Sequence, residues 1–530
     1  MRVLILLGLV ASSTLTTAQT TGSCVPGGVN GLLDASGVEV RLFTQGSIGY
    51  GPGFYNGNGY FVPRRSGRSP VYASFFRVAG RVGGDVRAVG TSFRTTDWSP
   101  GPLDVGATLP SPSGCSAFDR VWVVSKADVD AYNRGAAPSA DLREWPIGLG
   151  APTVDARGRR VTPEARQGII GTAGLAAGLR PVLSGSQTAF WVMNDVGAPH
   201  SVSQTAPLGV EVRATAFVVA SPDPAFDQAV FLRYEIVNRN RLPVEAAHAG
   251  FFVDHDLGQA SDDYAATDTT RGMAYAYNAN DNDSVYGIPP AHGIDLLDGL
   301  GASVATYNAS ADPTNTPTLG ADVYDRMRGL WNDGTPVREG GTGYGGTGHP
   351  TQFSFAGDPV AGAFWSNERI TAGGGRGSPG NIFIDLASPA FSLQPGETHV
   401  FNAAMLFAQG SSRLNSVVRL RAASDAIQAA YGAGGLFPVA GEAAPTTAPT
   451  AALGAPRPNP ARSDARLDVS ATGPSLVRVV DVLGRVVAEV PLGAGAREVR
   501  VDVRRLPGGV YTVVLSGDGV RAVQTLTVIR

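Results

Sequence analysis

The sequence predicts an all-β protein made of several β-sandwich domains, with an immunoglobulin-like domain at the C-terminus. Short runs alternate apolar and polar residues along most of the chain, which is the pattern of strands buried on one face. The 530 residues include 69 Gly and 37 Pro, which suits a fold with many turns. Helical spacing is convincing in one segment only, near 411–431. A chain of this length, 43% hydrophobic, can bury cores in two to four domains.

The N-terminus has the features of a secretory signal peptide at 1–18. Arg2 precedes an apolar run from Val3 to Val10, and a stretch of small residues ends at Ala18. That run is too short to cross a bilayer, and no later stretch is long enough for a transmembrane helix. We therefore expect export through the Sec machinery and a mature chain that is soluble or attached from outside.

Cys24 and Cys115 are the two cysteines of the chain. In an oxidising compartment they are expected to form a disulfide, which would stabilise the fold by about 4–5 kcal/mol in the chain-entropy model. The alternative is two unpaired cysteines.

The body of the chain is predicted as a β-rich N-terminal region, 19–205, followed by a central β-sandwich, 206–432. In the first region PVYASFFRVAG and DRVWVVSK have the pattern of strands. In the second, strands are expected at 210–220, 229–239 and 248–256. Pro395 and Gly396 suit the central positions of a type II turn between two further strands.

The one predicted helix lies just before a linker. Its apolar residues recur near helical spacing, Ser411 or Ser412 could cap its start, and Gly432 could end it. Residues 433–455 are rich in Ala, Pro and Thr and are expected to form an extended linker.

Residues 456–530 alternate like strands between Gly-containing turns, which predicts a small β-sandwich. Three motifs stand in a fixed order here: Pro458-Asn459-Pro460, then Asp481 with Gly484 and Arg485, and last Gly508-Gly509 with Tyr511. The segment resembles the type A C-terminal sorting domain of the type IX secretion system of Bacteroidetes. The resemblance implies recognition by the translocon, removal by a sortase-like protease, and a product that is extracellular or on the outer-membrane surface. The alternative is an ordinary immunoglobulin-like module.

The body also resembles an uncharacterised group of secreted proteins that carry the same sorting domain. The shared pieces include WSPGPL (98–103), CSAFDRVW (115–122) and FWVMND (190–195). This resemblance implies no established activity.

Four aspartates form the candidate metal site: Asp254, Asp256, Asp262 and Asp263. Residues two apart on a strand share a face, and Gly258 allows the chain to turn back. From Asp254 to Asp312 there are ten Asp and one cation, Arg271, so a hard dication with oxygen ligands would offset the repulsion. We expect calcium, with the Asn- and Asp-rich tract 278–284 completing this site or forming a second. The alternative is a solvated acidic loop.

Other features bear on function. The six histidines lack a tight zinc-ligand spacing, and His255 is expected at the surface or behind the aspartates, on the opposite face. Residues 49–61 space aromatic side chains with Gly and Asn, as in a sugar-stacking loop. The net charge of −3 does not indicate the excess of basic residues that is typical of nucleic-acid-binding proteins.

These observations favour a secreted, non-enzymatic structural or adhesive surface component with a calcium-stabilised loop. A secreted polysaccharide hydrolase, with paired aspartates as acid and base, and a carbohydrate-binding protein remain the alternatives, so a glycan or surface partner is possible. Whether the chain is an enzyme stays open.

Overall fold

The computed structural model describes residues 24, 27–55, 58–104, 106–107, 115–161, 168–307, 311–437, 451–471, 475–481, 486–493, 495–517 and 520–529. The predicted signal peptide, residues 438–450 of the predicted linker, and the motif residues Gly484 and Arg485 lie outside these ranges.

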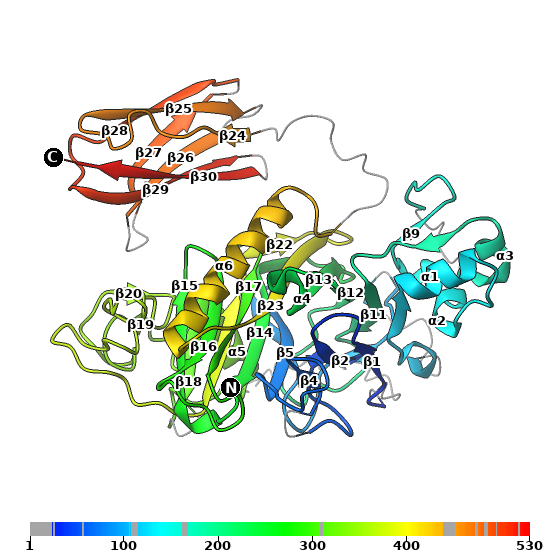
Figure 1. The fold of residues 1–530 in the computed structure, drawn as a ribbon. Coiled ribbons are helices and arrows are strands. Elements are labelled where there is room, and N and C mark those ends of the chain that lie inside the picture. The colour runs from blue at the N-terminus through cyan, green and yellow to red at the C-terminus, as the bar shows by residue number, and fades with distance from the viewer. Residues whose placement is uncertain are drawn as a thin grey trace, which may run out of the picture.

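Two large sheets form the body of the protein (Figure 1). The main path of the ten-stranded sheet is β1-β2-β3-β5-β14-β21-β18, and β4, β6 and β22 pair with strands of that path. Its strands are β1 (Asn30–Leu33), β2 (Glu39–Phe43), β3 (Ser47–Ile48), β4 (Tyr60–Phe61), β5 (Ala73–Val82), β6 (Asp85–Val89), β14 (Val244–His255), β18 (Ala302–Tyr307), β21 (Ile382–Ala387) and β22 (Phe391–Leu393).

The nine-stranded sheet follows the path β15-β16-β17-β23-β13-β12-β11-β7, with β8 paired to β11. Its strands are β7 (Ser99–Pro100), β8 (Trp122–Ser125), β11 (Gln187–Asn194), β12 (Val210–Val218), β13 (Ala229–Asn238), β15 (Asp263–Asp268), β16 (Met273–Asn278), β17 (Pro290–Leu296) and β23 (Thr398–Gln409). Two short ribbons, β9 (Thr153–Val154) with β10 (Arg180–Pro181) and β19 (Val337–Arg338) with β20 (Pro350–Thr351), lie outside both sheets.

The two sheets face each other across one apolar core, which confirms the predicted all-β sandwich. Phe76 of β5 stacks on Tyr234 of β13 with ring centroids 3.9 Å apart. Phe251 of β14 lies 5.8 Å from Phe401 of β23, also between centroids. Side chains on alternate positions of each strand fill this layer, as the sequence pattern requires.

Strands of both predicted body regions enter the same sheets. β5, from region 19–205, pairs with β14, from region 206–432, and β11 pairs with β12 across the predicted boundary. The two regions therefore form one sandwich, a difference from the expected division. Such pairing between distant strands leaves no mark in local periodicity, because each strand shows only which of its faces is buried.

The predicted helix is present as α6 (Arg413–Gly432), and the Ser412 side chain caps it by accepting from the Asn415 backbone N–H. Its buried residues, including Val417, Leu420 and Ile427, pack on the outer face of the nine-stranded sheet. The Pro395-Gly396 turn, with Gly396 at φ +84°, connects β22 of one sheet to β23 of the other rather than closing a hairpin.

Among the described residues, five shorter α-helices were not predicted: α1 (Lys126–Asn133), α2 (Ala140–Arg143), α3 (Gly171–Ala176), α4 (Pro224–Asp227) and α5 (Gly320–Met327). α1 had a signal in the sequence, because Ser125 and Asp128 form a capping box directly after β8. Residues of α2 and α3 join Trp122, Trp145 and Phe190 in a small separate core. α5 packs against the outer face of the ten-stranded sheet.

The C-terminal residues form a second, smaller sandwich, as predicted (Figure 1). One sheet contains β24 (Ala451–Leu453), β25 (Asp464–Ala471) and β28 (Glu498–Asp502). The other contains β26 (Ser475–Val480), β27 (Val486–Leu492), β29 (Gly509–Gly517) and β30 (Val520–Val528). Leu467 and Val499 of the first sheet share an apolar core with Val479 and Val513 of the second.

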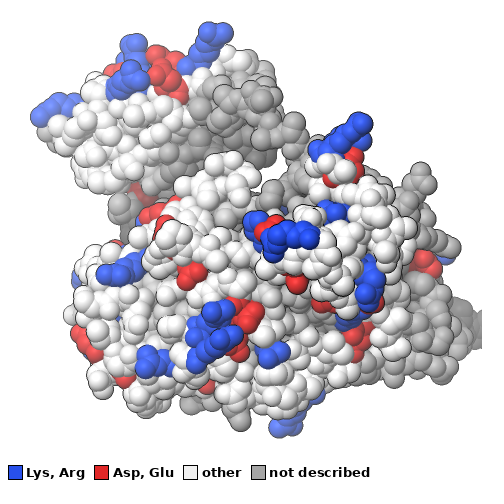
Figure 2. Space-filling view, turned by 45° about the vertical axis from the view of Figure 1, so that its right-hand side comes forward, with Lys and Arg blue, Asp and Glu red and all other residues white. Residues whose placement is uncertain are grey.

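On the face shown in Figure 2, acidic and basic side chains are interspersed among uncharged residues. In the part of the chain that the structure describes, no helix is both long and apolar enough to cross a membrane.

Candidate functional site

The acidic cluster lies where an inner strand of one sheet leads into an edge strand of the other. β14 of the ten-stranded sheet ends at His255, and the chain continues through Asp256 and Gly258 into a 3-10 turn, Ala260–Asp262. β15, the edge of the nine-stranded sheet, then begins at Asp263. The segment that carries the four predicted aspartates therefore connects the two sheets. The charge of Asp256 acts on both Asp254 and Asp263, but the four side chains are not gathered into one group.

Gly258 makes the turn between the sheets possible. Its φ is +79°, and a Cβ atom at this position would lie 2.3 Å from Oδ1 of Asp283. Asp283 is 2% exposed, and its Oδ2 accepts from the backbone N–H of Gln259 at 2.9 Å. The expected turn at Gly258 is present, and it is packed directly on a further aspartate.

The tract 278–284 folds onto the same cluster. The side-chain amide of Asn278 donates to Oδ1 of Asp262 at 3.0 Å, and that of Asn280 donates to Oδ2 at 2.9 Å. Asn278 is also 3.5 Å from Asp283. The tract thus adjoins the aspartates and adds Asp283, which the sequence named only as a member of the tract.

Burial makes ionisation of these carboxyls unfavourable. It raises the pKa of Asp254 to about 8, with the charge of Asp256 adding to the shift. Burial also raises the pKa of Asp256 to about 6. The pKa of Asp263 lies well above its ordinary value because the residue is fully buried and the charges of Asp262, Asp256 and Asp283 are near. Burial likewise raises the pKa of Asp262.

Several acceptor oxygens in the cluster are buried without a hydrogen-bond partner. They are Oδ1 of Asp254, Asp256 and Asp263, and Oδ1 of Asn278. Such groups are costly unless a donor or cation meets them. Over the described residues, no group of three or more His, Cys, Asp or Glu side chains is gathered closely enough to hold a metal ion.

Two aromatic side chains of the predicted loop 49–61, Tyr50 and Tyr55, lie on the same face of the ten-stranded sheet as Asp254. Tyr50 contacts Tyr55, Tyr72 and Phe93 with ring centroids 5.2, 5.5 and 5.6 Å apart. The charge of Asp254 contributes to the raised pKa of Tyr50, after burial and the charges of Tyr72 and Tyr55. Tyr55 is 46% exposed. Tyr72 and Phe93 have no local signal that connects them to this aromatic group, because their contacts with Tyr50 are long-range.

His255 differs from the expectation of a surface position. It is 1% exposed and lies between the sheets, 5.3 Å from His292 of β17 between ring centroids. Tyr60 contacts His292 from the ten-stranded sheet, 3.5 Å from its hydroxyl to Nε2. Burial lowers the pKa of His255 to about 3, so the ring is neutral. The strand alternation that turns Asp254 outward turns His255 into the core.

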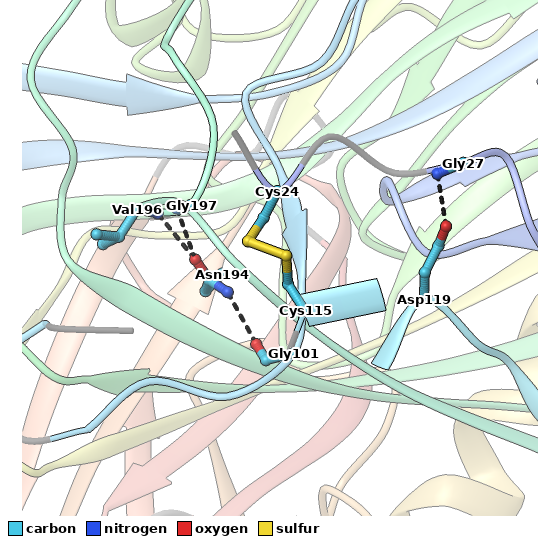
Figure 3. Close-up of a disulfide and its surroundings, with 8 residues drawn as sticks. All are labelled: Cys24, Gly27, Gly101, Cys115, Asp119, Asn194, Val196 and Gly197. Atoms are coloured by element: carbon cyan, nitrogen blue, oxygen red, sulfur yellow. Dashed lines mark hydrogen bonds between the residues drawn. A yellow bond between two sulfur atoms is a disulfide. The ribbon is translucent and has the colours of Figure 1, made fainter. Parts of the chain in front are cut away.

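The predicted disulfide is present. Cys24 and Cys115 are bonded, with Cα atoms 5.8 Å apart (Figure 3). The Cys24 backbone N–H donates to the carbonyl of Gly197, and the side chain of Asn194 donates to the carbonyl of Gly101. The disulfide and the first of these hydrogen bonds tie Cys24 to Cys115 and to the loop after β11, and the second joins β11 to the loop after β7.

In the C-terminal sandwich, residues of the predicted motifs make structural hydrogen bonds. Asn459 donates to the carbonyl of Thr525 at 2.9 Å and accepts from the backbone N–H of Thr527 at 2.8 Å. The Tyr511 hydroxyl donates to the carbonyl of Pro507 at 2.7 Å. Pro458 and Pro460 flank Asn459, Gly508 precedes β29 and Gly509 begins it, and Asp481 directly follows β26.

Comparison with known proteins identifies this last domain. Residues 458–529 match the family model described as "Secretion system C-terminal sorting domain". No curated protein matches the sequence.

Two solved structures show weak similarity. A polysaccharide lyase has 11% sequence identity and a TM-score of 0.24, with 64% of this chain and 39% of the lyase covered. A biofilm-associated protein's BSP domain has 9% identity and a TM-score of 0.14, with 99% of this chain and 84% of that one covered. The chain spans well under half of the lyase's length, and neither likeness supports a functional argument.

The domain match and the motifs at 458–511 together establish the route of export. The protein is a cargo of the type IX secretion system, secreted or attached at the cell surface, with its sorting domain at residues 458–529.

Proposed function

We propose that this cargo is a non-enzymatic structural or adhesive surface component whose sandwich is braced by a calcium ion at Asp254, Asp256, Asp262 and Asp263. The observation that carries the proposal is the set of buried acceptor oxygens without partners, on Asp254, Asp256 and Asp263. Calcium favours carboxylate and amide oxygens, which are the atoms this cluster offers.

The position of the cluster supports a bracing role. Asp254 belongs to the ten-stranded sheet, whereas Asp263 begins an edge strand of the nine-stranded sheet. A cation bound by both would link the two sheets at one end. It would also draw the carboxylates closer together than they lie in the described part of the chain, where no such group of ligands is preformed.

The electrostatics agree with this role. Metal binding requires ionised carboxylates. The pKa of Asp254, raised to about 8, keeps this carboxyl mostly protonated near neutral pH unless a cation is present, whereas Asp256, with a pKa of about 6, is already mostly ionised there. A bound ion adds its binding free energy to the stability of the folded state.

The experiment is calorimetry of the full-length mature protein in calcium and in EDTA. We expect EDTA to lower the melting temperature of the body. The double variant Asp254→Asn plus Asp256→Asn should lack this difference, while Asp85→Asn, at an exposed position on β6, should retain it. Equal melting temperatures in calcium and EDTA for the unaltered protein would reject the calcium site.

The aromatic patch of Tyr50, Tyr55, Tyr72 and Phe93 favours a second function, binding of a glycan. Tyr55 is exposed and Tyr72 and Phe93 are partly exposed, whereas Tyr50 is buried beneath them. Aromatic rings offer flat apolar faces, and Asp254 on the same face could accept from sugar hydroxyls. If the patch binds sugar, Tyr55→Ala should weaken retention in affinity electrophoresis on neutral polysaccharides. Release of reducing ends by the unaltered protein, abolished in Asp254→Asn, would instead indicate a hydrolase.

A further inference from the structure

A cavity of about 760 Å³ lies on the ten-stranded sheet, away from the acidic cluster. It is bounded by the C-terminal end of α5, the β19–β20 ribbon and the segments that lead into β18 and β22. Met327 and His248 are its most buried lining side chains, at 3% and 8% exposed. Pro350, Gln352 and Pro389 are exposed at its margin. This volume is within the range of small-ligand sites.

Two glycines allow the chain segments to approach closely enough to shape the cavity. A Cβ atom on Gly329, whose φ is +79°, would lie 2.6 Å from the Cα of Gln352. On Gly301 it would lie 2.4 Å from the carbonyl oxygen of Ser388. The lining segments are thus held by backbone packing, so the cavity is part of the fold.

The charged group at the cavity is basic. Arg328 lines it, and among the described residues that do so none is Asp or Glu. The guanidinium is held over the Tyr324 ring at 5.0 Å and pairs with Asp325 through one nitrogen, Nη1, at 3.1 Å. Its side chain is 39% exposed. A partly exposed ion pair of this kind contributes little stability, so a ligand carboxylate can compete for the guanidinium.

His248 supplies a complementary acceptor. Its Nδ1 lies 2.9 Å from the carbonyl oxygen of Ser388. A carbonyl oxygen only accepts, so Nδ1 carries the proton and Nε2 of the neutral ring presents a lone pair. Burial lowers the pKa of His248, which favours this neutral form. Nε2 can therefore accept a hydrogen bond from a ligand hydroxyl.

Apart from Thr351 and Gln352, the remaining lining side chains are apolar. Leu300, Phe353 and three prolines, Pro336, Pro350 and Pro389, offer C–H surfaces without charge. A ligand that matches the whole cavity has a carboxylate, hydroxyl donors and an apolar face.

We propose that this cavity binds an acidic sugar, with the carboxylate of a uronic acid unit on Arg328, a hydroxyl on His248 Nε2 and the ring face against Pro336 and Phe353. The volume accommodates more than one sugar unit. The site is separate from the acidic cluster and from the Tyr55 patch, and it does not depend on either.

The test is isothermal titration of the full-length mature protein with trigalacturonate and with the neutral galactose trisaccharide. We expect trigalacturonate to bind at least tenfold more tightly than the neutral sugar. Arg328→Gln should weaken trigalacturonate binding at least tenfold, and Arg328→Lys should restore part of the loss because it keeps the charge.

Arg81→Gln is the matched control. Arg81 also lies over the Tyr324 ring, at 5.5 Å, but does not line the cavity. Its substitution should leave binding unchanged, as should Tyr55→Ala. No binding of trigalacturonate, equal binding of the neutral sugar, or equal losses in Arg328→Gln and Arg81→Gln would overturn the proposal.

Discussion

Asp295 of β17 provides a pH-dependent contribution to stability that one substitution should remove. The side chain is fully buried beneath α6, where it accepts from Ser424 Oγ at 2.6 Å and from Gln428 Nε2 at 2.7 Å. Burial raises its pKa to about 7, against a value of 3.8 for the free side chain, although both hydrogen bonds act in the opposite direction.

The sign of the pH dependence of stability follows from proton binding to Asp295. Because the folded state holds this proton more tightly than the unfolded state, the folded protein is favoured at low pH. That advantage declines as pH rises through the interval from about 4 to about 7. One pKa unit corresponds to about 1.36 kcal/mol, so the decline between pH 5 and pH 8 amounts to about 2–3 kcal/mol.

Asp295→Asn keeps the size of the side chain and removes the titration. The new amide shifts the free energy of unfolding by an amount that does not depend on pH. The free energy of unfolding of the variant minus that of the parent should therefore rise by about 2–3 kcal/mol from pH 5 to pH 8. Guanidinium denaturation of both proteins at four pH values, followed by tryptophan fluorescence, measures this difference. A difference that does not change with pH would refute the reasoning.

Other predictions concern packing, the turn at the acidic cluster and the cross-link. Ile427→Ala, at a fully buried position of α6, should cost about 2–5 kcal/mol, whereas Val418→Ala on the same helix, 44% exposed, should cost under about 0.5 kcal/mol. Gly258→Ala should destabilise the protein more than Gly287→Ala. Both glycines have positive φ, but only at Gly258 does the added Cβ meet Asp283. Equal decreases of the melting temperature in the two variants would contradict this contact. The double variant Cys24→Ser plus Cys115→Ser should have a free energy of unfolding about 4–5 kcal/mol lower than that of the oxidised parent, because the cross-link spans 91 residues. An unchanged free energy of unfolding would show that the bond does not constrain the unfolded chain. In the sorting domain, Tyr511→Phe removes the hydrogen bond to Pro507 and should cost about 1 kcal/mol in denaturation monitored by circular dichroism, with no effect on the melting of the body.

Local pattern was enough to predict several strands of the body, the helix α6, the C-terminal sandwich and the export route. β12 and β13 lie where alternation placed them, α6 begins at its predicted cap Ser412, and the C-terminal motifs identified the sorting domain. The short helices were harder to predict, because α2 and α4 have four residues each and are fixed mainly by caps and packing.

Assignment of the sandwich and of the sites depended on contacts between distant residues. The alternation in β14 showed that Asp254 and His255 face opposite sides, but not which side is the core. In the folded chain, His255 lies in the core beside His292, which Tyr60 also contacts. Asp254 lies on the opposite side, near Tyr50.

Features that depend on residues near one another in the chain could be predicted from the sequence. They are the positions of several strands, the cap of α6 and the sorting domain of the type IX secretion system. Three features became visible in the folded chain. Regions 19–205 and 206–432 share two sheets, Asp283 packs against Gly258, and Arg328 and His248 line one cavity. They could not be predicted because strand pairing and burial join residues far apart in sequence, and a strand's own period does not encode its neighbour.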